Sequence, residues 1–149
     1  MSRAFAFLAA VLCVFSTTAM AQEFSALARV DADQSSITDL GRDAVQLDLA
    51  LSQGVPYRLF TLSEPSRLVV DFKEVDWSGL SAEKMVQTDR IGIVRFGTYR
   101  PGWSRLVAEL ITPMGITSAG LQVDDTTSAA HVTIRLDPTN DEDFAAIAG

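Results

Sequence analysis

A seven-residue sequence that occurs twice constrains the fold of this chain more than any other feature. It reads SRLVVDF at residues 66–72 and SRLVAEL at residues 104–110, so every position is identical or closely replaced. Each copy is rich in apolar residues and follows a turn signal, at residues 64–66 for the first copy and 100–103 for the second. Both copies are therefore predicted to be β-strands.

The two faces of these predicted strands carry different chemistry. Side chains alternate between the faces of a strand, so the apolar residues of each copy should point into the core. The outer face then carries Arg67 and Asp71 on the first strand, and Arg105 and Glu109 on the second. An arginine and a carboxylate on each outer face predict either cross-strand ion pairs or a polar surface for a ligand.

Short strand-like segments run through most of the chain. The clearest covers residues 45–51, where Val45, Leu47, Leu49 and Leu51 alternate with less apolar residues. Further strands are expected at residues 26–30, 36–40, 57–62, 91–99, 116–123 and 131–136. Glycines at 92 and 97 predict a bulge or a close backbone approach in one of these strands. A single helical turn is expected near residues 81–86, capped by Ser81.

About eight or nine strands at spacings of roughly 8–12 residues are typical of a β-sandwich or barrel. We predict an all-β fold, a β-sandwich of two related small sheets. Internal duplication would make the strands around residues 57–72 and 91–110 counterparts. The alternative is that strands reuse valine and leucine freely, in which case the repeat has no such meaning.

The first 21 residues have the pattern of a cleaved signal peptide. An apolar run covers residues 4–15, and Ala19-Met20-Ala21 is a typical cleavage site. The run is shorter than the about 20 residues that span a bilayer, so stable membrane insertion is not expected. Cleavage would remove Cys13, the only cysteine. A secreted domain without disulfides suits the bacterial periplasm, where we expect this protein.

The charge of the chain argues against two classes of partner. The formal net charge is −7, and only two lysines, Lys73 and Lys84, are present. Nucleic acids and anionic lipid surfaces bind clustered basic residues. We therefore expect no nucleic-acid partner.

Catalytic chemistry is not expected in this chain. His131 is the only histidine, and no cysteine follows residue 21, so neither a zinc site nor a Ser-His-Asp arrangement is indicated. Asp71 and Glu109 could in principle act as a glycosidase pair. Each lies beside an arginine, however, and a structural ion pair is the better interpretation. No metal or other cofactor is expected.

Basic and aromatic residues gather near the second copy. Arg95, Tyr99, Arg100 and Trp103 precede Arg105 within a short segment. Arginine offers a planar fork for carboxylates, and an exposed aromatic ring offers a face on which sugars stack. The alternative is that Trp103 packs against the edge of the sandwich while the arginines are solvated.

The other tryptophan, Trp77, lies in a segment without strand alternation. We expect it to fill part of the core rather than to contact a ligand.

Three segments in this order resemble the AMIN domain, the N-terminal module of many periplasmic N-acetylmuramoyl-L-alanine amidases. They are residues 57–72, which include Pro65 before the first copy, Val94-Arg95-Phe96-Gly97, and the second copy of the repeat. The similarity covers roughly residues 26–137. It implies a β-sandwich that binds peptidoglycan and directs an enzyme, often to the division site. The recurring arginines and acid of the family fall on Arg67, Asp71, Arg95 and Arg105.

The resemblance also guides the interpretation of the C-terminal segment. Residues 138–149 are acidic and are expected to begin a linker that is cut short, as though another domain should follow. In a longer parent protein that domain would be a zinc amidase, so zinc is expected only there.

Two functions follow from the sequence. The leading hypothesis is a non-catalytic, periplasmic module that binds peptidoglycan and serves as the N-terminal part of a cell-wall amidase. The alternative is a protein-interaction module that docks a cell-division or pilus-secretin assembly. The candidate ligand-binding residues are Arg67, Asp71, Arg95, Tyr99, Arg100, Trp103, Arg105 and Glu109.

Overall fold

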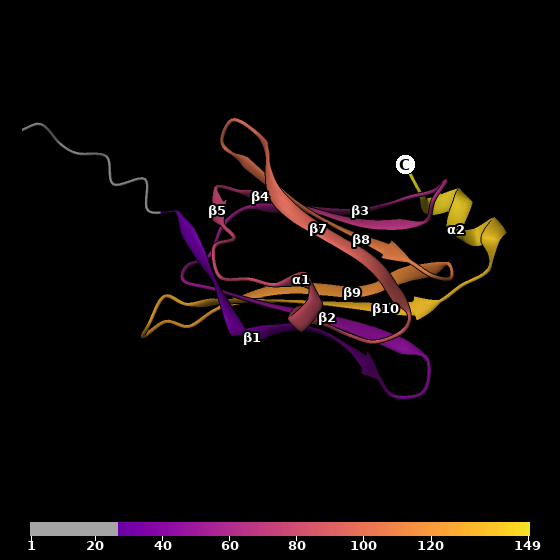
Figure 1. Cartoon of the computed structure of the whole chain (residues 1–149), viewed down its shortest axis with the longest axis horizontal. Coiled ribbons are helices and arrows are strands. Elements are labelled where there is room, and N and C mark those ends of the chain that lie inside the picture. Colours follow the sequence, from indigo (N-terminus) through magenta and orange to yellow (C-terminus); the bar gives the residue numbers. More distant parts are fainter. Residues whose placement is uncertain (1–26) are drawn as a thin grey trace, which may run out of the picture.

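The computed structural model describes residues 27–149, and the expected signal peptide at residues 1–21 lies outside the described residues. Two sheets pack face to face, and a short helix lies at one end of the chain (Figure 1). The smaller sheet is antiparallel, whereas the larger one is mixed, because β1 pairs with β5 and β6 in parallel. The all-β sandwich predicted from the strand pattern is confirmed.

The larger sheet has six strands. Its main path runs β5-β1-β2-β10-β9, and β6 pairs with β1 beside this path. The bounds are Ala28–Leu40 for β1, Ala44–Leu51 for β2, Val75–Asp76 for β5, Val86–Gln87 for β6, Met114–Val123 for β9 and Ala130–Pro138 for β10. The alternation predicted at residues 45–51 is present in β2, where the leucines are buried and Gln46 and Asp48 lie on the outer face.

The smaller sheet has four strands in the order β3-β4-β8-β7. The bounds are Tyr57–Leu62 for β3, Arg67–Lys73 for β4, Ile91–Arg100 for β7 and Trp103–Leu110 for β8. β3 and β4 form one hairpin, and β7 and β8 form another. The two copies of the repeated sequence are β4 and β8, which lie side by side in the middle of this one sheet.

The register of β4 and β8 has a local two-fold relationship. Arg67 lies opposite Glu109, and Asp71 lies opposite Arg105. Exchanging the two copies maps this pairing onto itself, because the arginine of each copy faces the carboxylate of the other. The two hairpins therefore occupy equivalent positions on either side of the β4–β8 seam, as internal duplication predicts.

The core lies between the sheets and is apolar. Leu47, Leu49 and Ile134 of the larger sheet face Phe72 and Leu106 of the smaller sheet, and all five are at most 1% exposed. Burying one such side chain contributes about 1.5–3 kcal/mol. The inward positions predicted for both copies of the repeated sequence all belong to this core.

Trp77 closes one end of the core. Its ring lies 5.8 Å from the ring of Phe72 and 5.4 Å from that of Phe96, measured between centroids. Only 8% of the residue is exposed. The expectation that Trp77 fills part of the core is confirmed.

The first strand differs from the prediction. Residues 26–30 and 36–40 were expected as separate strands, but β1 is continuous and carries a bulge between Asp31 and Ser36. The hydroxyl of Ser35 donates to the carbonyl of Asp31 at 2.7 Å and accepts the N–H of Ala50 at 3.0 Å. A serine side chain thus takes the place of a backbone acceptor, which allows the strand to bulge without breaking the sheet.

Two local predictions in the smaller sheet and its connections are confirmed. α1 (Ala82–Met85) is a single turn, and the hydroxyl of its N-cap Ser81 accepts from the N–H of Lys84. β7 is irregular between Ile91 and Val94, where Gly92 lies. The bulge turns Ile93 outwards, so Ile91 and Val94 are the residues that face the core.

The C-terminal segment is more ordered than the linker that its composition predicted. α2 (Asp141–Ile147) is capped by Asn140, whose side chain accepts from the N–H of Asp143. Phe144 is 2% exposed and belongs to the core cluster. Phe144 therefore holds the helix against the sandwich, together with Ala148, which packs on the core, and the N–H of Gly149, which donates to the carbonyl of Thr61.

Candidate functional site

The outer face of the smaller sheet is basic and aromatic. The residues that alternate with core residues on β3, β4, β7 and β8 include six cations, which are Arg58, Arg67, Lys73, Arg95, Arg100 and Arg105. Asp71 and Glu109 are the carboxylates of the same strand face, and Phe60, Tyr99 and Trp103 are its aromatic residues. We call this surface the basic-aromatic face.

A buried carboxylate organises the centre of this face. Asp71 Oδ1 accepts from Arg105 Nε at 2.6 Å, and Asp71 Oδ2 accepts from Arg105 Nη2 and Arg58 Nη2 at 2.9 Å each. The Asp71 side chain is 1% exposed. Asp71 lies on the outer face of the sheet, as the alternation predicted, but it is buried there because the two arginines cover it.

The ionisation of this group follows from its partners. Hydrogen bonding from Arg105 holds the pKa of Asp71 below its usual range, although burial acts in the opposite direction. The same hydrogen bonds raise the pKa of Arg105. Asp71 is therefore a permanent anion near neutral pH, unsuited to act as a general acid, and the predicted cross-strand ion pair is present.

Aromatic rings fix the positions of the arginines further. The guanidinium carbon of Arg105 lies 3.6 Å from the ring centroid of Tyr99 and 5.8 Å from that of Phe60. Arg100 lies 5.8 Å from the same tyrosine ring. Each contact of this kind contributes about 0.5–1 kcal/mol at an exposed site.

Three cations surround the indole ring of Trp103. Arg100 lies 5.4 Å from its centroid, Arg58 lies 5.8 Å away and Lys73 lies 5.9 Å away. Like charges at one ring repel each other, and an anion bound there would relieve this repulsion. We call this end of the face the Trp103 corner.

The structure brings most of the predicted site residues together. Asp71, Tyr99, Arg100, Trp103 and Arg105 form one connected cluster through the contacts given above. Four of these five residues come from the segment in which the sequence analysis predicted a concentration of basic and aromatic side chains.

The remaining predicted residues lie farther along the same face. Arg67 and Glu109 face each other four residues along the strands from Asp71 and Arg105, a separation of about 13 Å. Arg67 donates to the carbonyls of Pro65 and Ser63. Arg95 lies opposite Val107, between the two ends, and is exposed.

Two members of the cluster were missed by the sequence analysis. Arg58 lies on β3 opposite Asp71, and Lys73 lies on β4 opposite Trp103. The alternation that placed Arg67 and Asp71 outwards also places Lys73 outwards, so the strand pattern could have found it. Arg58 could not be assigned to the cluster from the sequence, because its position beside Asp71 depends on the pairing of β3 with β4.

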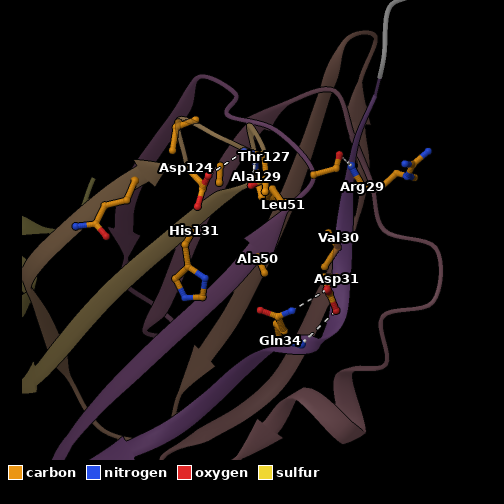
Figure 2. Close-up of a pocket in the computed structure, with 14 residues that line it drawn as sticks. Arg29, Val30, Asp31, Gln34, Ala50, Leu51, Asp124, Thr127, Ala129 and His131 are labelled. Atoms are coloured by element: carbon orange, nitrogen blue, oxygen red, sulfur yellow. Dashed lines mark hydrogen bonds between the residues drawn. The ribbon is translucent and has the colours of Figure 1, made fainter.

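A separate pocket lies on the larger sheet. It has a volume of about 650 Å³ and is lined by residues of β1, β2, β10 and the turn before β10, including Asp31, Gln34, Asp124 and His131 (Figure 2). None of the predicted site residues lines it. The bulge in β1 forms one side of the pocket.

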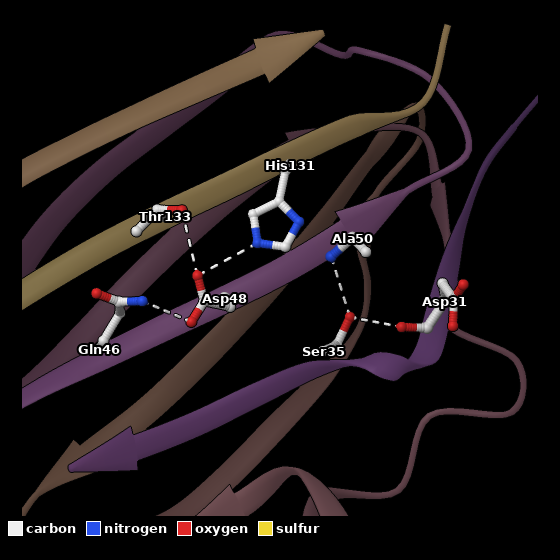
Figure 3. A network of polar contacts seen from close by, with 7 residues as sticks. All are labelled: Asp31, Ser35, Gln46, Asp48, Ala50, His131 and Thr133. Atoms are coloured by element: carbon white, nitrogen blue, oxygen red, sulfur yellow. Dashed lines mark hydrogen bonds and ion pairs between the residues drawn. The ribbon is translucent and has the colours of Figure 1, made fainter. Parts of the chain in front are cut away.

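The polar network beside this pocket is structural. Asp48 accepts from Gln46 and Thr133, and its Oδ1 lies 3.2 Å from His131 Nε2 (Figure 3). A His-Asp contact raises the question of a catalytic triad. The nearby Ser35 is 5% exposed, and its hydroxyl forms hydrogen bonds with the backbone of Asp31 and Ala50. It is therefore not placed as a nucleophile.

Within residues 27–149, His, Cys, Asp and Glu side chains do not form a group of three or more that could hold a metal ion. Across the same residues, neither helix is long and apolar enough to cross a membrane.

Comparisons with known proteins agree with the fold. A family model described as "AMIN domain" matches residues 36–138, from within β1 to the end of β10. The match therefore includes both sheets and all of the basic-aromatic face. A search of curated proteins finds no match.

Proposed function

Because this chain belongs to the AMIN domain family, we propose that it is a non-catalytic module that binds peptidoglycan in the periplasm through its basic-aromatic face. AMIN domains are peptidoglycan-binding and targeting modules of periplasmic proteins. The choice of surface rests on the charges and rings described above.

The observation that carries the proposal is the concentration of positive charge on one face of an acidic protein. The chain has 12 lysines and arginines and a net charge of −7, yet six of these cations lie on the outer face of one small sheet. The peptides of peptidoglycan bear carboxylates, and its glycan strands present sugar rings. Arginine forks recognise the former, and an indole face stacks with the latter.

The hydrogen bonds of Asp71 also favour the basic-aromatic face as the binding surface. Arg58 and Arg105 are held in place before any ligand arrives, since both donate to one buried carboxylate. Holding rotamer-rich side chains in position lowers the entropy lost on binding. Arg58 keeps 59% of its side chain exposed, so it can still contact a ligand.

The direct experiment is co-sedimentation of the domain with purified sacculi at low and moderate salt. We expect the wild-type domain to pellet and the double variant Lys73→Gln/Arg100→Gln to pellet at least tenfold less, because both cations flank Trp103. The matched control is Arg42→Gln/Arg135→Gln, which removes the same charge from the larger sheet and its turns. Wild-type protein that stays in the supernatant at both salt concentrations would refute the proposal.

We further propose that the domain directs an N-acetylmuramoyl-L-alanine amidase. This proposal rests on the family's usual setting and concerns a longer parent protein. Reading the coding DNA beyond Gly149 tests it. A continuing frame with a His/Glu metal pattern is the expected result, and an immediate stop codon contradicts it.

A second candidate function is docking of a cell-division or secretion protein at a sheet edge. β9 is an edge strand of the larger sheet, and its ten residues include no charged side chain. Uncharged edge strands can accept an added strand. Pull-down from a periplasmic extract with and without glycan digestion separates the candidates, because only protein docking survives digestion.

A further inference from the structure

A pocket of about 450 Å³ adjoins the basic-aromatic face at the Trp103 corner. It lies between the segment at residues 74–78 and the β7–β8 hairpin. Trp103 lines the pocket and also belongs to the face, so a ligand seated on the face can extend a group into the pocket.

The lining of this pocket differs from the face beside it. No lysine, arginine or histidine lines it, and Glu74 and Asp76 are its charged residues. A carboxylate is therefore disfavoured inside the pocket, although the adjoining face favours one. Small residues, namely Gly97, Gly102 and Ser104, line it together with the two tryptophans.

One residue that lines the pocket carries a buried hydrogen-bond donor without a partner among the described residues. Trp77 lines the pocket, and its buried Nε1 donates to no acceptor among the described residues. Buried polar groups are nearly always hydrogen-bonded, and an unsatisfied one is costly. A ligand carbonyl oxygen that displaces the groups covering Nε1 would satisfy this donor.

We propose that this pocket takes the acetamido group of an N-acetylated amino sugar. The group is uncharged, its carbonyl accepts one hydrogen bond, and its methyl packs against indole rings. This inference rests on the proposed function, since the glycan of peptidoglycan is built from N-acetylated amino sugars. It adds a neutral subsite to a surface that otherwise selects for negative charge.

Intrinsic fluorescence offers a direct test, because both tryptophans of the protein line the pocket. We expect the trimer of N-acetylglucosamine to shift the emission of the wild-type domain and the glucosamine trimer to leave it unchanged. Trp77→Phe keeps a buried ring and removes the N–H, so it should weaken binding of the N-acetylated trimer about fivefold, followed through Trp103. An identical response to both trimers overturns the proposal.

A second arm varies the ligand and needs no variant, in case Trp77→Phe does not fold. Wild-type protein is sedimented with untreated, de-N-acetylated and chemically re-acetylated sacculi at low and moderate salt. We expect binding to fall on de-N-acetylation and to return on re-acetylation. The fall should remain at moderate salt, which weakens repulsion between the freed ammonium groups and the basic face. Equal binding to all three at moderate salt overturns the pocket proposal and leaves the proposal of peptidoglycan binding intact. Absence of binding to untreated sacculi instead refutes the proposed function, and the trimers alone then decide the pocket.

Discussion

Arg105 and Asp71 lie opposite each other on adjacent strands and are joined by two hydrogen bonds, of 2.6 Å and 2.9 Å. The arginine covers the carboxylate on its solvent side, and Arg58 completes the cover from β3. Asp71 therefore lies beneath the surface and positions Arg58 and Arg105, which are the groups that a ligand would meet at the proposed site.

Replacing the buried carboxylate should destabilise the fold. Asp71→Asn leaves two arginines without their shared anion, and we expect a loss of about 2–3 kcal/mol in the free energy of unfolding. Urea denaturation measures it. The control is Asp137→Asn, which removes an exposed pair with Arg135 and should hardly move the urea midpoint. Equal midpoint shifts for the two variants would contradict the central role of Asp71.

The same carboxylate should make stability depend on pH in acid. The pKa of Asp71 is lower in the folded protein than the value of about 3.9 in an unfolded chain. The unfolded state therefore binds more protons as the pH falls, and the stabilisation present above pH 4 is lost through the folded-state pKa. We expect the stability difference between wild type and Asp71→Asn to shrink from pH 7 to pH 2. A difference that stays constant across this range would show that charge on Asp71 is not its source.

The two ends of the basic-aromatic face should differ in function. Trp103→Ala removes the ring that three cations surround, and we expect at least a tenfold loss of sacculus binding. Arg67→Gln acts at the opposite end, where the guanidinium already donates to two backbone carbonyls, and we expect less than a threefold loss. Co-sedimentation of both variants measures this, with circular dichroism to verify folding. A larger loss for Arg67→Gln would move the binding site to that end.

Tyr99 should act through its ring. It is 49% exposed, so Tyr99→Ala should change stability little while it frees the guanidinium of Arg105. We expect sacculus binding to fall about threefold to tenfold. Tyr99→Phe keeps the ring and should bind like wild type. If Tyr99→Phe lost as much binding as Tyr99→Ala, the hydroxyl rather than the ring would be responsible.

The C-terminal helix should depend on one side chain. Phe144→Ala removes a buried ring, and we expect a loss of about 3 kcal/mol. Hydrogen exchange should show faster exchange of the amides of residues 141–149, while those of β4 and β8 change little. Ile147→Ala is the control because Ile147 is 61% exposed. Similar exchange in both variants would mean that Phe144 does not anchor the helix.

Much of the fold could be predicted because the alternation of apolar and polar residues can be recognised within a single strand. The apolar residues of β2, β4 and β8 identify their inward faces without any knowledge of neighbours. Pairing is different, since it depends on residues far apart in the sequence. The burial of Asp71 arises from Arg58 and Arg105 on two other strands, and no pattern within β4 reveals it.

The remaining differences have local causes. β1 was divided in two because its bulge interrupts the alternation, while Ser35 preserves the hydrogen bonding that keeps it one strand. α2 was expected as a linker because acidic composition outweighed the single apolar Phe144. For the candidate site, the sequence placed the rings and arginines near one turn, but only the register showed that Lys73 lies against Trp103.

The two-fold pairing of β4 and β8 has a consequence for how a polymer could lie on the protein. Around the Val69–Val107 pair, the order of arginine and carboxylate is the same when the seam is followed from either end. A glycan strand laid along the seam would thus meet one arginine of the repeat near each end, whichever way its chain runs. Direction can be sensed where the symmetry fails, namely at the end where Asp71 is buried beneath Arg58 and Arg105 and at the adjoining Trp103 corner. That end should decide whether the domain is oriented or reversible on its polymer.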